Sequence, residues 1–200
     1  MVNTAVLVSG GGTNLQALID ARDSGILEHC NLALVVSSKP DAYALTRAEN
    51  ARVRSIVVDR KAYADRESFS GALLRVMWEY EMEFIIFAGF THVLSKSFTD
   101  AFENRIINVH PSLIPAFCGD GFYGLRVHKA ALDYGVKVTG ATVHFVNEVT
   151  DGGQIIMQKA VDVLDGDTPE ILQKRVMEQA EWFLLPQAAE MVCKQIAEVR

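Results

Sequence analysis

Short apolar runs of strand length alternate with amphipathic stretches through the first 110 residues of this chain. Residues 5–9 form a continuous apolar run that ends in glycines, and the further runs cover residues 32–37, 54–58, 83–88 and 106–109. Between them, helical stretches are predicted over residues 14–24, 42–51 and 66–80, with a helical turn after Gly89-Phe90. Continuous apolar strands separated by helices are typical of a parallel sheet that is covered on both faces.

The last third of the chain has a different pattern. A helix is predicted over residues 126–134, and strands over residues 140–146 and 154–161 would form a hairpin-like antiparallel extension at one sheet edge. A final helix begins near Thr168-Pro169-Glu170, with threonine at the N-cap and proline at the first helical position. We therefore predict a single α/β domain over residues 1–200, a Rossmann-like open twisted sheet that is mostly parallel.

Composition limits the class of protein. The 200 residues carry a formal net charge of −6, which gives no electrostatic footprint for general nucleic-acid binding but permits an anionic ligand in a local pocket. The three scattered cysteines (Cys30, Cys118 and Cys193) indicate reduced thiols, with no disulfide frame and no metal site. The N-terminal apolar run is too short for a signal or membrane-spanning helix. We expect a cytoplasmic protein without membrane partners, either a monomer or a weak homodimer.

A glycine loop joins the first strand to the first helix. Gly10, Gly11 and Gly12 are followed by Thr13 and Asn14. Glycines let the backbone approach a ligand, and a helix start presents free N–H groups to an anion, so phosphate binding is the favoured interpretation. The loop lacks the Gly-Lys-Ser/Thr of a P-loop and the third glycine of a dinucleotide fingerprint, which disfavours a nicotinamide dehydrogenase. The alternative is a tight turn without a ligand.

The segment from Ile106 to Pro115 is the strongest catalytic candidate. An apolar strand ends there in a stiff loop with two prolines, and Asn108 and His110, two residues apart, would point to the same side of the sheet. A neutral amide donor beside a histidine suits a carbonyl that becomes an oxyanion.

The other histidines and Asp151 are less distinctive. No HExxH spacing occurs; His128 is expected at the surface or boundary, His29 could cap a helix end, and His144 is as compatible with a structural as with a functional role. Asp151 lies in a turn with Gly152 and Gly153, where aspartate is common without function. Near His110 it would raise the pKa of that imidazole and keep it cationic, but the sequence does not place it there.

These segments together resemble a known family over almost the whole chain. The residues 9–16, 88–90, 107–115, 139–146 and 151–156, with the late Glu181, are similar to those of the phosphoribosylglycinamide formyltransferases, folate-dependent enzymes of purine biosynthesis. The NxHPSLxP pattern of residues 108–115 is shared with related 10-formyltetrahydrofolate hydrolases and formyltransferases. The glycine loop, the short length and the DGG segment favour this member.

The resemblance implies a role for particular residues. Asn108, His110 and Asp151 would be catalytic; Gly12, Thr13 and Asn14 would hold the phosphate of 5-phosphoribosylglycinamide, and Glu181 would contact its ribose. The folate of the co-substrate 10-formyltetrahydrofolate would meet Arg66, Thr91, His92, Val93, Leu94 and Asn108. The nucleotide-binding half would cover residues 1–100, and the catalytic and folate-binding half residues 101–200. The amine would attack the formyl group directly, without an acyl-enzyme and without a metal.

Two segments depart from the pattern of the family. Many members have Met-Arg where this chain has Thr91-His92, and the stretch 116–124 differs from the shorter loop of some relatives; its glycines suggest a flap. Rival interpretations are a formyltetrahydrofolate deformylase, a methionyl-tRNA formyltransferase, which would need a basic RNA-binding domain, and a non-catalytic nucleotide-binding module on the same fold.

Overall fold

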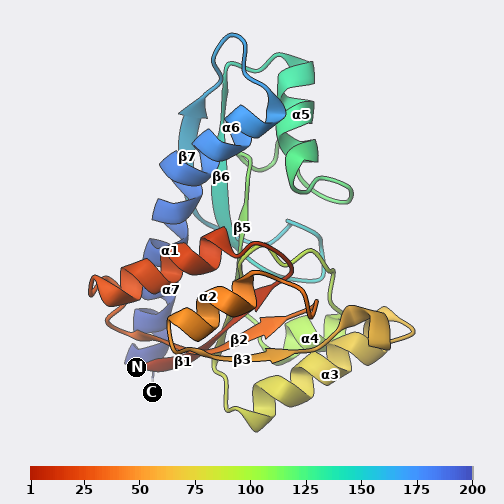
Figure 1. The fold of residues 1–200 in the computed structure, drawn as a ribbon, viewed down its shortest axis with the longest axis vertical. Coiled ribbons are helices and arrows are strands. Elements are labelled where there is room, and N and C mark those ends of the chain that lie inside the picture. The colour runs from red at the N-terminus through yellow and green to blue at the C-terminus, as the bar shows by residue number, and fades with distance from the viewer. Residues whose placement is uncertain (200) are drawn as a thin grey trace.

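A single seven-stranded sheet organises the computed structural model, which describes residues 1–199. The spatial order is β3-β2-β1-β4-β5-β6-β7, and the sheet twists strongly from one edge to the other (Figure 1). Strands β1 to β5 pair in parallel, whereas β6 runs antiparallel to both β5 and β7. The strands are β1 Val2–Val8, β2 Cys30–Ser37, β3 Arg54–Val57, β4 Phe84–Phe87, β5 Ile106–His110, β6 Val138–Phe145 and β7 Ile155–Asp162. The predicted mostly parallel α/β sheet with an antiparallel extension is confirmed.

Helices cover both faces of the parallel part of this sheet, as Figure 1 shows for α1 and α2 on one side and α3 and α4 on the other. Neighbouring strand residues serve opposite layers: Val6 packs in the cluster of α1 and α7, and Leu7 in the cluster of α3 and α4. The helices are α1 Thr13–Asp23, α2 Ala44–Asn50, α3 Arg66–Glu79, α4 Lys96–Ala101, α5 Leu125–Tyr134, α6 Pro169–Val176 and α7 Trp182–Glu198, with a short 3₁₀ turn η1 at Arg60–Ala62.

The end of the chain differs from the single final helix that the sequence predicts. The helix begins as expected, since the Thr168 hydroxyl accepts from the Ile171 N–H and proline follows at the first position. A π-helical turn, η2, then interrupts it over Met177–Glu181 before α7 begins. Such a turn inserts one residue per turn and redirects the side chains that follow, and it is frequent at functional sites.

The antiparallel strands bring distant polar residues together. In the β5–β6 register, Asn108 lies opposite His144, and His110 lies opposite Thr142. The Thr142 hydroxyl donates to the Ser112 carbonyl (2.7 Å) and accepts from the Ile114 N–H (3.1 Å), so β6 holds the proline-containing loop after β5 in place. Among residues 1–199, none of the helices has the length and apolar character needed to span a bilayer.

Candidate active site

A cavity of about 430 Å³ lies at the carboxyl ends of β4 and β5. It adjoins the end of β1, where the sheet order changes from β1-β2-β3 on one side to β4-β5 on the other. Open α/β sheets place their ligands at such a reversal of strand order. Asn14, Asn108, His110, Asp151 and Glu181 all line this cavity, so the structure brings together predicted residues that are up to 167 positions apart.

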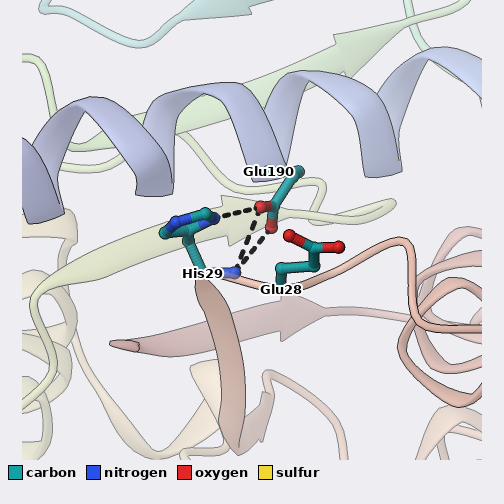
Figure 2. Close-up of side chains that lie close together, drawn as sticks. All are labelled: Glu28, His29 and Glu190. Atoms are coloured by element: carbon teal, nitrogen blue, oxygen red, sulfur yellow. Dashed lines mark hydrogen bonds and ion pairs between the residues drawn. The ribbon is translucent and has the colours of Figure 1, made fainter.

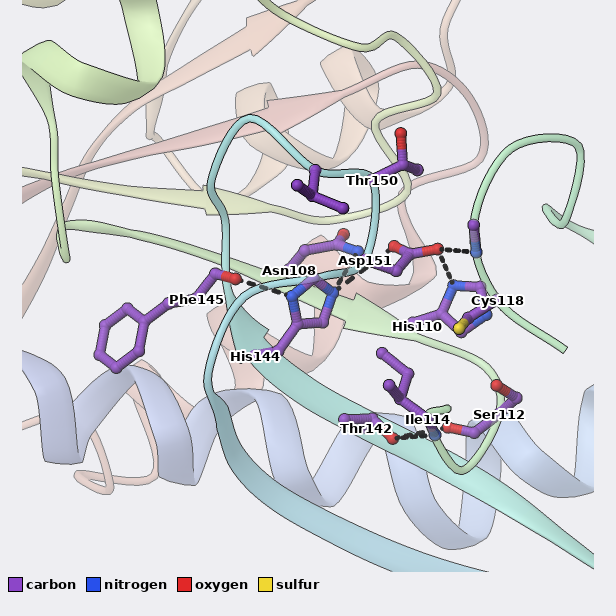
Figure 3. Close-up of polar contacts among 12 residues, drawn as sticks. Asn108, His110, Ser112, Ile114, Cys118, Thr142, His144, Phe145, Thr150 and Asp151 are labelled. Carbon is purple, nitrogen blue, oxygen red and sulfur yellow. Dashed lines mark hydrogen bonds and ion pairs between the residues drawn. The ribbon is translucent and has the colours of Figure 1, made fainter. Parts of the chain in front are cut away.

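Asn108 and His110 enter the cavity from the end of β5, as predicted. The Asn108 amide nitrogen donates to Nε2 of His144 (3.3 Å), and Nδ1–H of His144 donates to the Phe145 carbonyl (2.8 Å). These bonds fix both the ring of His144 and the amide of Asn108 (Figure 3). His144, which the sequence left undecided, is therefore a buried residue that orients Asn108.

Asp151 lies between two histidines. Its Oδ2 is 3.4 Å from Nδ1 of His110 and accepts from the Gly119 N–H (2.9 Å), while Oδ1 is 3.6 Å from Nε2 of His144. The Asp151 side chain is only 9 % exposed. The proximity of Asp151 and His110, which spacing alone could not establish, follows from the return of the chain along β6 (Figure 3).

The pKa values of this pair move in the same direction for different reasons. Burial lowers the pKa of His110 below its ordinary value and outweighs the charge of Asp151 and the Phe117 carbonyl, which both raise it. Burial raises the pKa of Asp151, but the contacts with His144, His110 and the Gly119 N–H together bring it below its ordinary value. The expectation that Asp151 would keep His110 cationic is therefore wrong for the unliganded protein, because desolvation of the ring is the larger effect.

A sharp turn presents Asp151 to the histidines. Asp151 itself has a φ of 54°, in the left-handed region that few residues other than glycine, asparagine and aspartate adopt. At Gly153, a Cβ would lie 1.8 Å from the Phe145 carbonyl oxygen, so no side chain fits there. Gly153 is therefore required, because the backbone passes too close to the end of β6 there for any side chain.

The loop 116–124 closes over His110 and Asp151. Nε2–H of His110 donates to the Phe117 carbonyl (2.9 Å), and the Gly119 N–H reaches Asp151. The Thr150 hydroxyl donates to the Asp120 carboxylate (2.8 Å), which ties the loop to the turn that carries Asp151. The predicted flap is therefore an ordered lining of the site in this structure.

The glycine loop surrounds the start of α1. Gly12 is the N-cap with a φ of 71°, and a Cβ there would lie 2.7 Å from Cβ of Ala44, so this glycine is required by packing against α2. Gly10 and Gly11 have open space where a Cβ would stand. No side chain caps the first turn of α1, which leaves its N–H groups available to an anion. Thr13 lines a neighbouring cavity of about 520 Å³ between α1 and α7 instead of the catalytic one.

Glu181 is buried against Asn14, at the end of the cavity that adjoins the glycine loop. The Asn14 amide nitrogen donates to Oε2 of Glu181 (2.7 Å), and Oδ1 of Asn14 is buried without a hydrogen-bond partner. Burial raises the pKa of Glu181 to about 7, against the lowering effect of the Asn14 amide. The π-turn η2 is the element that places this carboxyl beside α1.

The predicted folate-binding residues separate into two groups. Thr91, His92, Val93 and Leu94 line the cavity together with Gly89 and Phe90. Arg66 is exposed at the start of α3 and does not belong to the cavity lining, so its role stays a prediction.

Two expectations about histidines are wrong. His128 is fully buried on α5, and both of its ring nitrogens lack a hydrogen-bond partner; burial lowers its pKa to about 4. His29 does not cap a helix end: it precedes β2, where its Nδ1 is 2.5 Å from Oε1 of Glu190 on α7 (Figure 2). Both oxygens of Glu190 also accept from the His29 N–H, so this contact, with Glu28 nearby, joins a strand to a helix.

An amide donor, a histidine and a carboxylate that converge on one cleft of an open α/β sheet define an enzyme active site suited to chemistry at a carbonyl. The family model described as formyl transferase matches residues 2–188. The chain belongs to this formyl transferase family.

Known relatives agree with this assignment. The chain is 38% identical to phosphoribosylglycinamide formyltransferase of Haemophilus influenzae, over 93% of this chain and 84% of that protein. It is 43% identical to the trifunctional purine biosynthetic protein adenosine-3 of Gallus gallus, over 99% of this chain but only 19% of that longer protein. The crystal structure of glycinamide ribonucleotide transformylase 1 from Symbiobacterium toebii superimposes with a TM-score of 0.91 at 40% identity, covering 98% of this chain and 89% of that one.

Proposed function

We propose that this protein transfers the formyl group of 10-formyltetrahydrofolate to the amine of 5-phosphoribosylglycinamide, a step of purine biosynthesis. The observation that carries the proposal is the convergence of Asn108, His110 and Asp151 on one cavity between the glycine loop and the loop 89–94. The names of the relatives support the same acceptor and the same group transfer.

The acceptor would bind at the glycine-loop end of the cavity. Its phosphate would meet the uncapped N–H groups at the start of α1, with Gly12, Thr13 and Asn14 around it. The carboxylate of Glu181 offers acceptors for ribose hydroxyls. The glycyl amine would then point toward the end of β5.

The formyl donor would bind at the opposite end of the cavity. The segment Thr91 to Leu94 would hold the pterin, and Arg66 would approach the glutamate tail from the start of α3. Asn108 contributes to both ends, since it lies between this segment and the acceptor site. Bringing two substrates into one cleft converts a bimolecular encounter into an oriented one. This lowers the activation free energy by several kcal/mol.

The chemistry would proceed by direct attack. The amine nitrogen forms a bond to the formyl carbon, and the carbonyl oxygen becomes an oxyanion that Asn108 and His110 stabilise. The proton that the amine loses is held transiently on His110, whose cationic form Asp151 stabilises. It then passes to the folate nitrogen as the bond between that nitrogen and the formyl carbon breaks. In the unliganded protein both ring nitrogens of His110 face acceptors, Phe117 and Asp151. Donation to the oxyanion therefore requires Nε2–H to leave the Phe117 carbonyl, while Nδ1 stays against Asp151.

An absorbance assay of formyl transfer from a 10-formylfolate analogue, with and without 5-phosphoribosylglycinamide, tests the proposal. We expect turnover that requires the ribonucleotide. Equal turnover without it would identify water as the acceptor and favour a deformylase, and no turnover in either condition would favour a binding module.

A further inference from the structure

Thr91-His92, one of the two segments that depart from the family pattern, is held by a chain of hydrogen bonds that runs to the glycine loop. The Thr91 N–H donates to Oγ of Ser9 (3.2 Å), Oγ of Ser9 is 2.7 Å from Oγ of Ser38, and Oγ of Ser38 is 3.2 Å from Nε2 of His92. We call these four residues the serine relay. Ser9 immediately precedes Gly10, so the relay joins the donor loop 89–94 to the loop at the acceptor end.

One set of proton positions satisfies every group of the serine relay. Ser9 accepts from Thr91 and donates to Ser38, and Ser38 donates to a neutral His92. Burial, with the charges of Arg60 and Lys39, lowers the pKa of His92 and keeps the ring neutral at pH 7. The two serines are 4 % and 1 % exposed, so water competes little for these bonds.

The partners of the relay are themselves fixed in position. The Ser38 N–H donates to the Val8 carbonyl (3.0 Å), and the Arg60 N–H donates to the Ser38 carbonyl (3.1 Å). The His92 ring makes edge contacts with Phe69 and Phe90, at centroid distances of 5.6 Å and 5.4 Å. A displacement of either loop therefore perturbs the hydrogen bonds of the relay, because both serine side chains are buried and each hydroxyl already has a partner on either side.

We propose that the serine relay couples the two substrate subsites, with Ser9, Ser38 and His92 acting as positioning residues. A ligand that orders the glycine loop also fixes the donor loop, so the second ligand loses less conformational freedom on binding. This inference rests on the proposed function, because it assigns the donor to the loop 89–94 and the phosphate to the start of α1.

Calorimetry with an unreactive pair of ligands measures the coupling directly. Ribose 5-phosphate lacks the amine, so it can occupy the acceptor site while a 10-formylfolate analogue is titrated. We expect saturating ribose 5-phosphate to lower the Kd of the analogue by about fivefold in the wild type. In Ser38→Ala and in Ser9→Ala, saturating ribose 5-phosphate should change the Kd of the analogue by less than about twofold.

Ser70→Ala is the matched control. The Ser70 hydroxyl accepts from the Ser95 N–H (2.9 Å), so it holds the end of the same donor loop, but to α3 and not to the glycine loop. This variant should lose a buried serine hydroxyl and keep the fivefold coupling. Equal loss of coupling in Ser70→Ala, retained coupling in Ser38→Ala, or no coupling in the wild type would each overturn the inference.

The formyl-transfer assay separates this failure from a failure of the proposed function. Full turnover without coupling refutes the relay alone. A wild type that binds neither ribose 5-phosphate nor the folate analogue refutes both.

Discussion

At the scale of single residues, Asp151 connects three parts of the site, namely His110, His144 and the Gly119 N–H. Its Oδ2 accepts from the Gly119 N–H and faces Nδ1 of His110, and its Oδ1 faces Nε2 of His144. Asp151→Asn keeps the shape of the side chain but removes the negative charge that would stabilise His110 when the ring becomes protonated. We expect kcat to fall by roughly two orders of magnitude or more, with KM values nearly unchanged, in steady-state formyl transfer.

Asp120→Asn provides the comparison for that variant. Asp120 is exposed and accepts a single bond from Thr150 on the same turn. Its kcat should stay close to the wild-type value. An Asp151→Asn enzyme with kcat within a few-fold of wild type would remove the carboxylate from the chemistry.

Glu181 should make stability depend on pH. Its pKa is about 7 in the folded protein against 4.5 as the ordinary value, so the folded state binds this proton more tightly. The resulting stabilisation is complete below pH 4.5 and is lost as pH rises through about 7, and the difference corresponds to about 3 kcal/mol.

Glu181→Gln removes this titration while keeping the size of the side chain. Urea unfolding at pH 5 and pH 8 should show that the free energy of unfolding of the wild type declines more steeply than that of the variant. Parallel declines in the two proteins would contradict a raised pKa.

At the scale of elements, the turn between β6 and β7 determines whether Asp151 reaches the site. Gly153→Ala would force its Cβ against the Phe145 carbonyl, and the backbone would have to move. We expect a loss of about 2 kcal/mol or more of stability in thermal unfolding, together with a large loss of kcat. Gly71→Ala, in the middle of α3 with open space around it, should be neutral or stabilising by about 0.5–1 kcal/mol; similar losses in both variants would argue against the steric explanation.

Sequence patterns predicted elements more reliably than their interruptions. The apolar runs located every strand of the sheet, and the signal is strongest in central strands such as β1 and β4, where burial on both faces leaves a continuous hydrophobic run. β1 nevertheless begins at Val2 and not at residue 5, since the Thr4 hydroxyl is satisfied by the Val2 carbonyl inside the strand. The π-turn that positions Glu181 was not predicted, because residues 177–181 carry ordinary helix formers and only tertiary packing distinguishes the two backbones.

At the scale of the whole molecule, one end of the sheet carries the proposed active site and the other carries a contact that stabilises the fold. The catalytic cavity lies at the carboxyl ends of the strands, whereas the contact between His29 and Glu190 joins the amino end of β2 to α7. Glu190→Ala would leave the His29 N–H without its acceptor. We expect a loss of about 1–2 kcal/mol of stability in chemical unfolding and an unchanged kcat. A selective loss of turnover in a fully folded variant would refute this separation.

Long-range geometry explains what the sequence could not supply. Asn108 and His110 were predictable from a strand that ends in prolines, because two residues fix their relative direction. The position of Asp151 depends on the reversal at β6, more than 30 residues later, and the burial of His128 depends on how α5 packs. The pKa of His110 is lowered because the surrounding structure buries the ring, and a linear sequence pattern does not contain that information.

The antiparallel reversal at β6 has a consequence for how such an enzyme could change. Asn108, His110, His144 and Asp151 all fall within one uninterrupted stretch of 44 residues, from 108 to 151, whereas the glycine loop and Glu181 lie outside it. Under the proposed function, the residues of the chemical step and those that bind the acceptor therefore lie in separate parts of the sequence. Libraries confined to Gly10, Gly11, Thr13, Asn14 and residues 173–181 would explore new acceptors while leaving residues 108–151 unchanged.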